Sequence, residues 1–230
     1  MTQASPPIRI AIYDMDKTIT RRPTYGGFLI HMAMARAPWR LLLAPLMLIG
    51  LAAYGLRLWD RSRLKTFNQR LFVGKPKETD PAFLHAVETF ADKVIAKNLH
   101  ADAAARIAHD RTEGYRLVLA TASYAIYVLP IARRLGFDHV IATDLRLGGG
   151  GEWLAEIIEG NCYGMVKIDK VRRWLADEGL DRGALHVRAY SDHVSDAPLL
   201  KFADEAFAVN PHPPLRAEAA RRGWQVFDWT

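Results

Sequence analysis

The chain has 230 residues, a net charge of +6 and a single cysteine, and half of its residues are hydrophobic. This composition supplies a sizeable core and excludes a largely disordered chain. Cys162 alone excludes an internal disulfide and a cysteine-cluster metal site, and it fits a reducing compartment. Residues 1–7 lack the basic-then-apolar pattern of a secretory signal, so we expect a cytoplasmic protein.

The first predicted element is a buried parallel strand over residues 8–13, a short apolar run that ends at Asp14-Met15-Asp16-Lys17-Thr18. In an open α/β sheet, ligands bind at the carboxyl ends of the strands, where Asp14 and Asp16 stand. Two carboxylates so close repel each other unless a cation lies between them or one keeps its proton. A solvated turn would explain an isolated Asp-x-Asp pair, but the motifs that follow favour a site.

Residues 21–95 are predicted to form an all-helical insertion, which leaves residues 1–20 and 96–230 as an α/β core. Between residues 21 and 75 there are ten basic residues and one acidic residue, a net charge of +9. The whole chain carries +6, so the remainder carries −3. The same insertion holds the strongest apolar run, the sixteen uncharged residues from Leu41 to Leu56.

This run is shorter than the ~20 residues that span a bilayer, and Pro45, Gly50 and Gly55 interrupt it. A single crossing would also separate Asp14 from the acidic motif near residue 192, so a lone transmembrane helix is excluded if these motifs share one site. Two interpretations remain. The run packs into the core of a helical bundle, or it lies on a membrane with basic flanks on anionic head groups.

Helices are also predicted over residues 63–72 and from 82 to about 97, the second with Asp80 as N-cap and Pro81 in its first turn. A further helix over about 101–113 returns the chain to the α/β core. The expected buried face of the 82–97 helix consists of Leu84, Val87, Phe90, Ala91 and Val94.

A second buried strand over residues 116–120 ends in Thr121-Ala122-Ser123, and a helix over about 125–135 follows. A hydroxyl at the tip of a strand, together with the exposed backbone N–H groups of the turn, can hydrogen-bond a phosphate oxygen. Alone this signal is weak, because Thr and Ser at such positions commonly serve as helix caps.

A third strand over 139–143 precedes four glycines, Gly148 to Gly151, which predict a hairpin tip. They do not form a phosphate loop, because no Lys-Ser/Thr follows them. In the helix that runs through residues 161–175, Lys167 lies in the first turn, near the positive end of the helix dipole, where it needs an anion beside it. A solvated position is expected for Lys170.

The strand over 186–190 ends at Ser191-Asp192-His193-Val194-Ser195-Asp196, which adds two carboxylates at another strand end. With Asp14 and Asp16 they form an oxygen-rich group suited to Mg²⁺. His193 is expected to face solvent. A strand over 205–209, a helix to about 222 and a strand over 225–228 complete the predicted sheet.

In this order, Asp14-x-Asp16-x-Thr18, Thr121, Lys167 and Asp192-x-x-x-Asp196 resemble the four motifs of the haloacid dehalogenase superfamily. The helical insertion between the first two motifs resembles the cap of its phosphoserine phosphatase-like branch, subfamily IB. The resemblance implies a Rossmann-like, doubly wound parallel sheet with an inserted all-helical cap.

It also implies a phosphatase that forms a covalent aspartyl-phosphate. Asp14 would be the nucleophile, and Asp16 would protonate the leaving alcohol and then deprotonate the attacking water. Thr121 and Lys167 would stabilise the oxygens of the transferring phosphoryl group. Three further residues would contact the substrate: Thr18, Ala122 and Ser123.

The cofactor that the resemblance implies is Mg²⁺. Asp14, Asp192 and the backbone carbonyl of Asp16 would hold it, and Asp196 would support it from farther out or through water. The chain departs from the family at two positions. Lys17 stands where glycine is common, and Ser195 stands where asparagine is common. Neither change removes a catalytic group, so we expect an active enzyme.

Two classes of substrate stay open. Pro23 stands where phosphoserine phosphatases carry a glutamate for the substrate amine, which counts against phosphoserine. The basic, apolar insertion resembles that of the phosphatidylglycerophosphatase C family, which implies a lipid phosphate, an anionic membrane surface and a place on the inner face of the membrane. Arg21 and Arg22 are candidates for head-group contact. A small soluble phosphate monoester is the alternative.

Two hypotheses from other functional classes, a protein without catalytic activity and a nucleic-acid-binding protein, have less support from the sequence. A catalytically quiet scaffold or membrane-docked regulator would not need four chemically complete motifs. Nucleic acid is not expected as a partner, because the positive charge alternates with aliphatic runs rather than with stacking aromatic residues.

Overall fold

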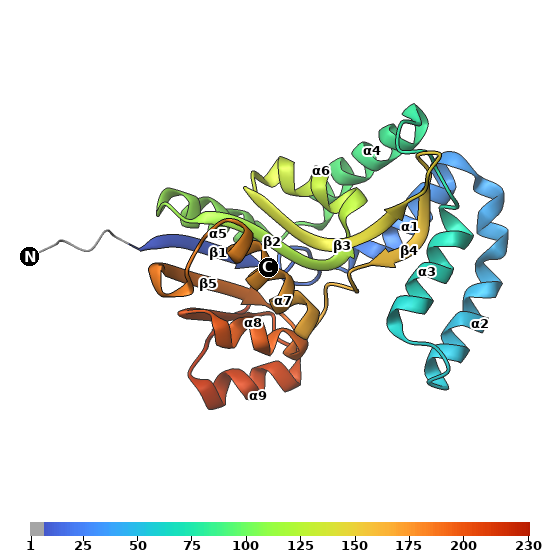
Figure 1. Cartoon of the computed structure of the whole chain (residues 1–230). Coiled ribbons are helices and arrows are strands. Elements are labelled where there is room, and N and C mark those ends of the chain that lie inside the picture. The colour runs from blue at the N-terminus through green and yellow to red at the C-terminus, as the bar shows by residue number, and fades with distance from the viewer. Residues whose placement is uncertain (1–6) are drawn as a thin grey trace, which may run out of the picture.

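The computed structural model describes residues 7–230, which form one seven-stranded sheet with helices on both of its faces (Figure 1). Residues 1–6, which are most of the N-terminal segment that lacks the pattern of a secretory signal, lie outside the described residues. The elements are β1 (Ile8–Tyr13), α1 (Thr24–Arg36), η1 (Pro38–Leu43), α2 (Ala44–Gly55), α3 (Arg61–Phe72), α4 (Pro81–Asn98), α5 (Ala101–Thr112), β2 (Arg116–Tyr124), α6 (Ala125–Leu135), β3 (His139–Leu147), β4 (Trp153–Ile158), α7 (Met165–Asp177), η2 (Arg182–Ala184), β5 (Leu185–Ser191), η3 (Val194–Asp196), α8 (Ala197–Phe202), β6 (Glu205–Val209), α9 (Pro213–Arg222) and β7 (Gln225–Phe227).

The strand order of the sheet is β4-β3-β2-β1-β5-β6-β7, and all pairs are parallel except β3 with β4. At the carboxyl end of the central strand β1, Tyr13 pairs with Leu119 of β2 and with Tyr190 of β5. The polar residues that follow these three strands therefore lie at one edge of the sheet. The predicted doubly wound α/β fold is confirmed, and the four glycines form the tip of the β3–β4 hairpin.

Successive residues of β1 face opposite sides of the sheet, as they must in a strand. Ala11 and Tyr13 belong to the apolar cluster that includes residues of α4, α5 and α6, whereas Ile10 and Ile12 belong to the cluster with α7, α8 and α9. Since both faces are covered, the buried part of the strand, residues 10–13, is apolar on both sides. This burial fixes the direction in which β1 delivers Asp14.

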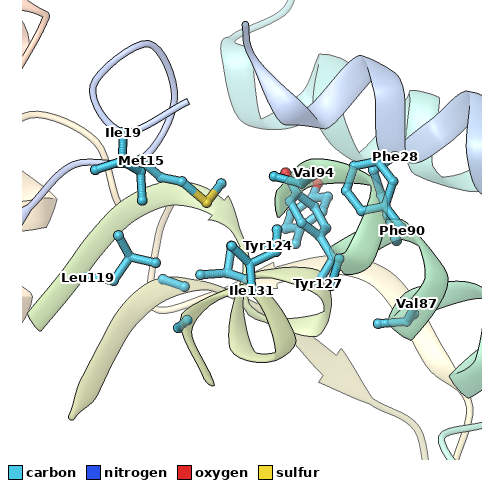
Figure 2. Close-up of a cluster of buried hydrophobic side chains, with 14 of the residues drawn as sticks. Met15, Ile19, Phe28, Val87, Phe90, Val94, Leu119, Tyr124, Tyr127 and Ile131 are labelled. Carbon is cyan, nitrogen blue, oxygen red and sulfur yellow. The ribbon is translucent and has the colours of Figure 1, made fainter. Parts of the chain in front are cut away.

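Helices α1 to α4 lie between the first two motifs, and α4 joins this insertion to the core. Phe28 of α1 packs against Phe90 of α4 at 5.4 Å and against Tyr127 of α6 at 4.4 Å between ring centroids (Figure 2). Because α4 runs through residue 95 and packs on α6, the division of the chain at residues 21 and 95 remains a prediction.

The buried face of α4 differs at one position from the predicted face. Phe83 is buried and Leu84 is 48% exposed, while the other four predicted residues are buried. Both Phe83 and Leu84 continue the helical spacing of the apolar residues downstream, so periodicity alone does not separate them.

The apolar run of the insertion lies on the surface. Leu42, Leu48 and Leu56 are 81%, 66% and 71% exposed, and α2 buries only Gly50. At Gly50 a Cβ atom would lie 3.0 Å from Leu64 and 3.1 Å from Phe67, so glycine is what lets α2 approach α3. The interpretation in which this run fills the core of a helical bundle is therefore wrong for the chain by itself.

Among the described residues, one helical stretch, Pro38–Gly55, is long and apolar enough to cross a membrane by length and composition alone. Its two ends return to the same body, however. Helix α1 packs on α4, and α3 contacts β4 (Figure 1). A single crossing would place α1 and α3 on opposite sides of the bilayer, whereas these two helices contact each other.

Candidate active site

Asp14 is anchored at the end of β1 and held through both of its carboxylate oxygens. Its backbone N–H donates to the carbonyl of Tyr190 at 2.9 Å. Its Oδ1 accepts from Lys167 Nζ at 2.8 Å, and its Oδ2 accepts from the Thr18 hydroxyl at 3.2 Å. The turn that brings Thr18 back contains Lys17 at φ +65°, a left-handed conformation in which glycine carries no steric cost.

Lys167, in the first turn of α7, ties two carboxylates together. Besides Asp14 it donates to Asp196 Oδ2 at 2.6 Å, and its side chain is 2% exposed. Burial alone would lower the pKa of Lys167, but attraction to Asp14 and Asp196 outweighs burial and raises it, so the amine stays charged. Since an ammonium has three donors, one remains for a further oxygen.

The group formed by Asp14, Asp192 and Asp196 holds more negative charge than Lys167 neutralises. Burial, followed by the charges of Asp14 and Asp196, raises the pKa of Asp192 to about 7. Burial raises the pKa of Asp14 to about 6, against the opposing effect of Lys167. In addition, Asp196 Oδ1 is buried with no hydrogen-bond partner within residues 7–230. A hard cation would relieve both features.

The residues present therefore fit Mg²⁺, although they do not already form a cage. Within the described part of the chain, no three His, Cys, Asp or Glu side chains converge as a ready metal site. Asp16 would offer its backbone carbonyl, while its carboxylate is hydrogen-bonded to Thr24 and Ser123.

Asp16 connects the insertion to the carboxyl end of β2. Its Oδ1 accepts from the backbone N–H and from the hydroxyl of Thr24, both at 2.8 Å, and its Oδ2 accepts from the Ser123 hydroxyl at 2.8 Å. Thr24 is the first residue of α1, so the carboxylate satisfies a free N–H at the start of that helix. The residue expected to move a proton is thus in contact with both parts of the molecule.

The carboxyl end of β2, which runs to Tyr124 and so past the predicted end at residue 120, presents Thr121 and Ala122 to the cleft. Thr121 Oγ1 accepts from the Ser123 N–H at 3.1 Å, which leaves the hydroxyl hydrogen of Thr121 free to donate. The carbonyl of Ala122 is held from behind by Lys65 Nζ at 2.7 Å and by the Thr143 hydroxyl at 2.8 Å. Ser123 supports Asp16 rather than lining the cleft.

These side chains surround a cleft of about 260 Å³, large enough for a phosphate and a small alcohol. Its walls are formed by thirteen residues, namely Asp14, Asp16, Lys17, Pro23, Arg61, Thr121, Ala122, Tyr163, Lys167, Asp192, His193, Ser195 and Asp196. Thr18 is absent from this wall and instead holds Asp14.

Three expectations about side chains differ from the structure. Lys170 was expected to be solvated, but its side chain is 10% exposed and donates to the carbonyl of Ala142 at 3.1 Å and to Asp144 at 3.2 Å. His193 was expected to face solvent, but it lines the cleft and stacks on His212 with ring centroids 4.1 Å apart. Arg21 and Arg22 do not line the cleft; they border a separate cavity. The linker that carries them is held to Asn98, which accepts from the backbone N–H groups of both arginines.

The cation that the insertion does bring to the cleft is Arg61 of α3. Its guanidinium lies 4.5 Å from the ring centroid of Tyr163, which also lines the cleft. In the sequence Arg61 is one of many basic residues in the insertion. The sequence offered one signal for its position. Lys65 lies four residues later, and residues four apart lie on the same face of a helix.

Lys65 is a second functional candidate that the sequence did not indicate. It is 8% exposed, and it donates to Ala122 and to Asn161 Oδ1, the latter at 3.1 Å. Burial, with repulsion from Arg61, lowers the pKa of Lys65 to about 7. A lysine of the insertion therefore holds the catalytic turn of the core.

This buried amine gives stability a specific pH dependence. An unfolded lysine keeps its proton to about pH 10.4, so between pH 7 and pH 10 the unfolded state binds more protons. We expect the free energy of unfolding of the wild type to rise over this range relative to Lys65→Met, by at most about 1.4 kcal/mol per pH unit. Urea unfolding from pH 6 to pH 9 measures it. If the free energies of unfolding of the wild type and of Lys65→Met change in parallel with pH, the lowered pKa of Lys65 is contradicted. Lys75→Met, a change at an exposed lysine, serves as control.

A buried aspartate clamped by a lysine, with hydroxyl and backbone donors beside it at a sheet edge, is equipped to receive a phosphoryl group. The class of protein that the fold and this site define is an α/β phosphohydrolase. The chain belongs to the haloacid dehalogenase-like hydrolases, whose family model matches residues 11–201. The predicted superfamily is confirmed, and the chain is an enzyme of the phosphatase type.

Two relatives are consistent with this placement. The chain is 30% identical over 232 residues to a Streptomyces azureus protein named for inhibition of morphological differentiation, and this match covers 97% of the chain and 79% of that protein. It is 36% identical over 143 residues to a probable phosphatase of Mycobacterium tuberculosis, with 62% of the chain covered. The match spans 48% of that mycobacterial protein.

Solved structures agree with the fold. A Bordetella pertussis protein of unknown function has a TM-score of 0.84 and 28% identity, with 96% of this chain and 99% of that chain covered. A substrate complex of phosphoserine phosphatase has a TM-score of 0.61 and 14% identity over 98% of this chain and 94% of that chain, a likeness of fold alone.

Proposed function

We propose that the chain hydrolyses a phosphate monoester through an aspartyl-phosphate on Asp14, with Mg²⁺ as cofactor. The observation that carries the proposal is the convergence of Asp14, Lys167 and Thr121 on one small cleft. An Asp14 oxygen forms a bond to phosphorus while the bond to the alcohol oxygen breaks. Asp16 gives its proton to that oxygen, then takes one from the water that releases phosphate and regenerates Asp14.

The remaining groups hold charge in place during both steps. Lys167 keeps Asp14 ionised and has one donor for a phosphoryl oxygen, and the Thr121 hydroxyl supplies another. Asp14, Asp192 and the Asp16 carbonyl would hold Mg²⁺, with Asp196 behind them. When bound, this ion supplies positive charge that lets an anionic nucleophile approach an anionic phosphate.

We further propose that the substrate is a lipid phosphate, such as phosphatidylglycerophosphate, and that the protein works on the inner face of the membrane. The exposed apolar surface of η1 and α2 supports this. Trp39, Leu48 and Ile49 are 59%, 66% and 60% exposed, and several arginines flank them. An apolar helix with basic flanks is suited to an anionic bilayer. Arg61 extends this positive charge to the cleft.

The test compares Mg²⁺-dependent phosphate release from phosphatidylglycerophosphate in mixed micelles with release from soluble monoesters. Chelation of Mg²⁺ is expected to abolish both. Replacement of Leu48 and Ile49 together by serine is expected to lower lipid turnover at least about tenfold, because each leucine or isoleucine withdrawn from water contributes roughly 1.5–3 kcal/mol. Soluble turnover should stay unchanged.

Leu84→Ser is the matched control, since it removes an exposed leucine from α4, outside this surface. Turnover of soluble esters alone would reject the lipid and keep the phosphatase. The cleft of about 260 Å³ would accommodate such a small ester. No release from any ester would leave the protein as a catalytically quiet regulator and reject the proposal.

A further inference from the structure

A second cavity, larger than the active-site cleft, lies where the insertion joins the core. Its volume is about 440 Å³, and we call it the linker pocket. The two chain segments that join insertion and core meet here, since the Arg21 N–H donates to the Asn98 carbonyl at 2.7 Å and the Asn98 side chain bonds the backbone of Arg22. The pocket is lined by Arg21, Arg22, Pro23, Thr24, Gly27, Phe90, Lys93, Val94, Lys97 and Asn98.

Its four cations, Arg21, Arg22, Lys93 and Lys97, have no acidic partner. None of them forms an ion pair with a carboxylate of residues 7–230, and the pocket wall contains no acidic residue. The nearby acids of α4 are engaged on the opposite face of that helix, where Glu88 and Asp92 pair with arginines of α6. Like charges four residues apart on a helix repel, so Lys93 and Lys97 favour an anion between them.

The floor of the pocket is apolar, and Gly27 leaves space there because it has no side chain. Phe90 and Val94 are 4% and 3% exposed and face α1 (Figure 2). A Cβ atom on Gly27 would find only Phe90, at an ordinary 3.8 Å, so packing does not require glycine there. Glycine inside a helix costs about 1 kcal/mol relative to alanine. The helix is thus weakened at a point where a side chain would occupy the cavity.

We propose that the linker pocket binds an amphiphilic organic anion. The anionic head, a phosphate, sulfonate or carboxylate, lies among the four cations. A short alkyl or aryl body lies on Gly27, Phe90 and Val94. A cavity of this volume suits such a molecule. The site adjoins the cleft, with Pro23 in the wall of both and Thr24 donating to Asp16, but its binding of an anion does not depend on the proposed reaction.

Octanesulfonate is a suitable probe, because it carries both parts and cannot be hydrolysed as an ester. Isothermal titration below its micelle concentration is expected to show one saturable site. Methanesulfonate, which has no tail, and octyltrimethylammonium, which has the opposite charge, should not bind measurably. Gly27→Leu fills the floor and should weaken octanesulfonate binding at least tenfold. Arg22→Gln combined with Lys97→Gln should do the same by removing charge.

Gly26→Leu is the matched control, since it makes the same change on the same helix at a residue that does not line the pocket. Thermal unfolding of both leucine variants establishes that they are folded. Equal binding by Gly27→Leu and Gly26→Leu would overturn the proposal, as would the absence of saturable binding to the wild type. Retained binding after the double charge change would overturn it as well.

One further arm identifies the source of the anion. Vesicles of phosphatidylcholine with phosphatidylglycerol are titrated with wild type, Gly27→Leu and Gly26→Leu. Weaker vesicle binding by Gly27→Leu alone assigns the pocket to a lipid head group. Unchanged vesicle binding, together with lost octanesulfonate binding, assigns it to a free small anion.

Discussion

Asp14→Asn is expected to lower phosphate release by at least about 10⁴-fold without unfolding the protein. An amide has nearly the shape of a carboxylate but is a poor nucleophile towards phosphorus. Burial already disfavours the charge on Asp14, raising its pKa to about 6. Lys167 keeps Asp196 as a partner in the variant. The loss should therefore appear in turnover and not in the thermal unfolding midpoint.

The measurement is initial-rate phosphate release at saturating Mg²⁺, with mass spectrometry for phosphoryl transfer to the protein. The wild type should show a phosphorylated species during turnover, and the variant should show none. Asp144→Asn is the control, because Asp144 pairs with Lys170 outside the cleft. Substantial turnover by Asp14→Asn would mean that another group attacks the phosphate.

Lys167→Met is expected to destabilise the fold as well as to impair catalysis. It removes the ammonium that lies 2.8 Å from Asp14 Oδ1 and 2.6 Å from Asp196 Oδ2, and both carboxylates are buried. Breaking a buried ion pair from one side costs about 3–5 kcal/mol, because a charge is left without compensation. Turnover should fall by roughly 10³-fold, because one donor that stabilises the charge of the transition state is lost.

The loss of stability caused by Lys167→Met should depend on pH, because it leaves a buried carboxylate without its cation. Without Lys167 the pKa of Asp14 must rise further, so acid can neutralise Asp14 in the folded state. The destabilisation should therefore be largest at pH 7–8 and smaller at pH 5, in urea unfolding with a chelator present. Lys75→Met is the control, with an expected change within about 0.5 kcal/mol, because Lys75 is exposed. A pH-independent loss would indicate a packing defect instead.

The sequence by itself determined the sheet, the family and the centre of the site. A buried strand is apolar on both faces, so its end is visible where polar residues begin, as at Asp14 after residues 8–13. Parallel strands end at the same edge, so the residues after three such strands had to converge. That Lys167 would meet Asp14 followed from its place in the first turn of a helix, where a cation needs an anion.

Other features were decided only by the tertiary structure. Arg21, Arg22 and Arg61 are chemically alike, and only the path of the linker and the orientation of α3 direct Arg61 alone into the cleft. Likewise, apolar spacing fits both a buried and a surface helix, and the run from Leu41 to Leu56 lies on the surface because the chain offers little to cover it. Local pattern specifies what a residue can do, whereas the neighbours that long-range packing supplies decide whether it does so.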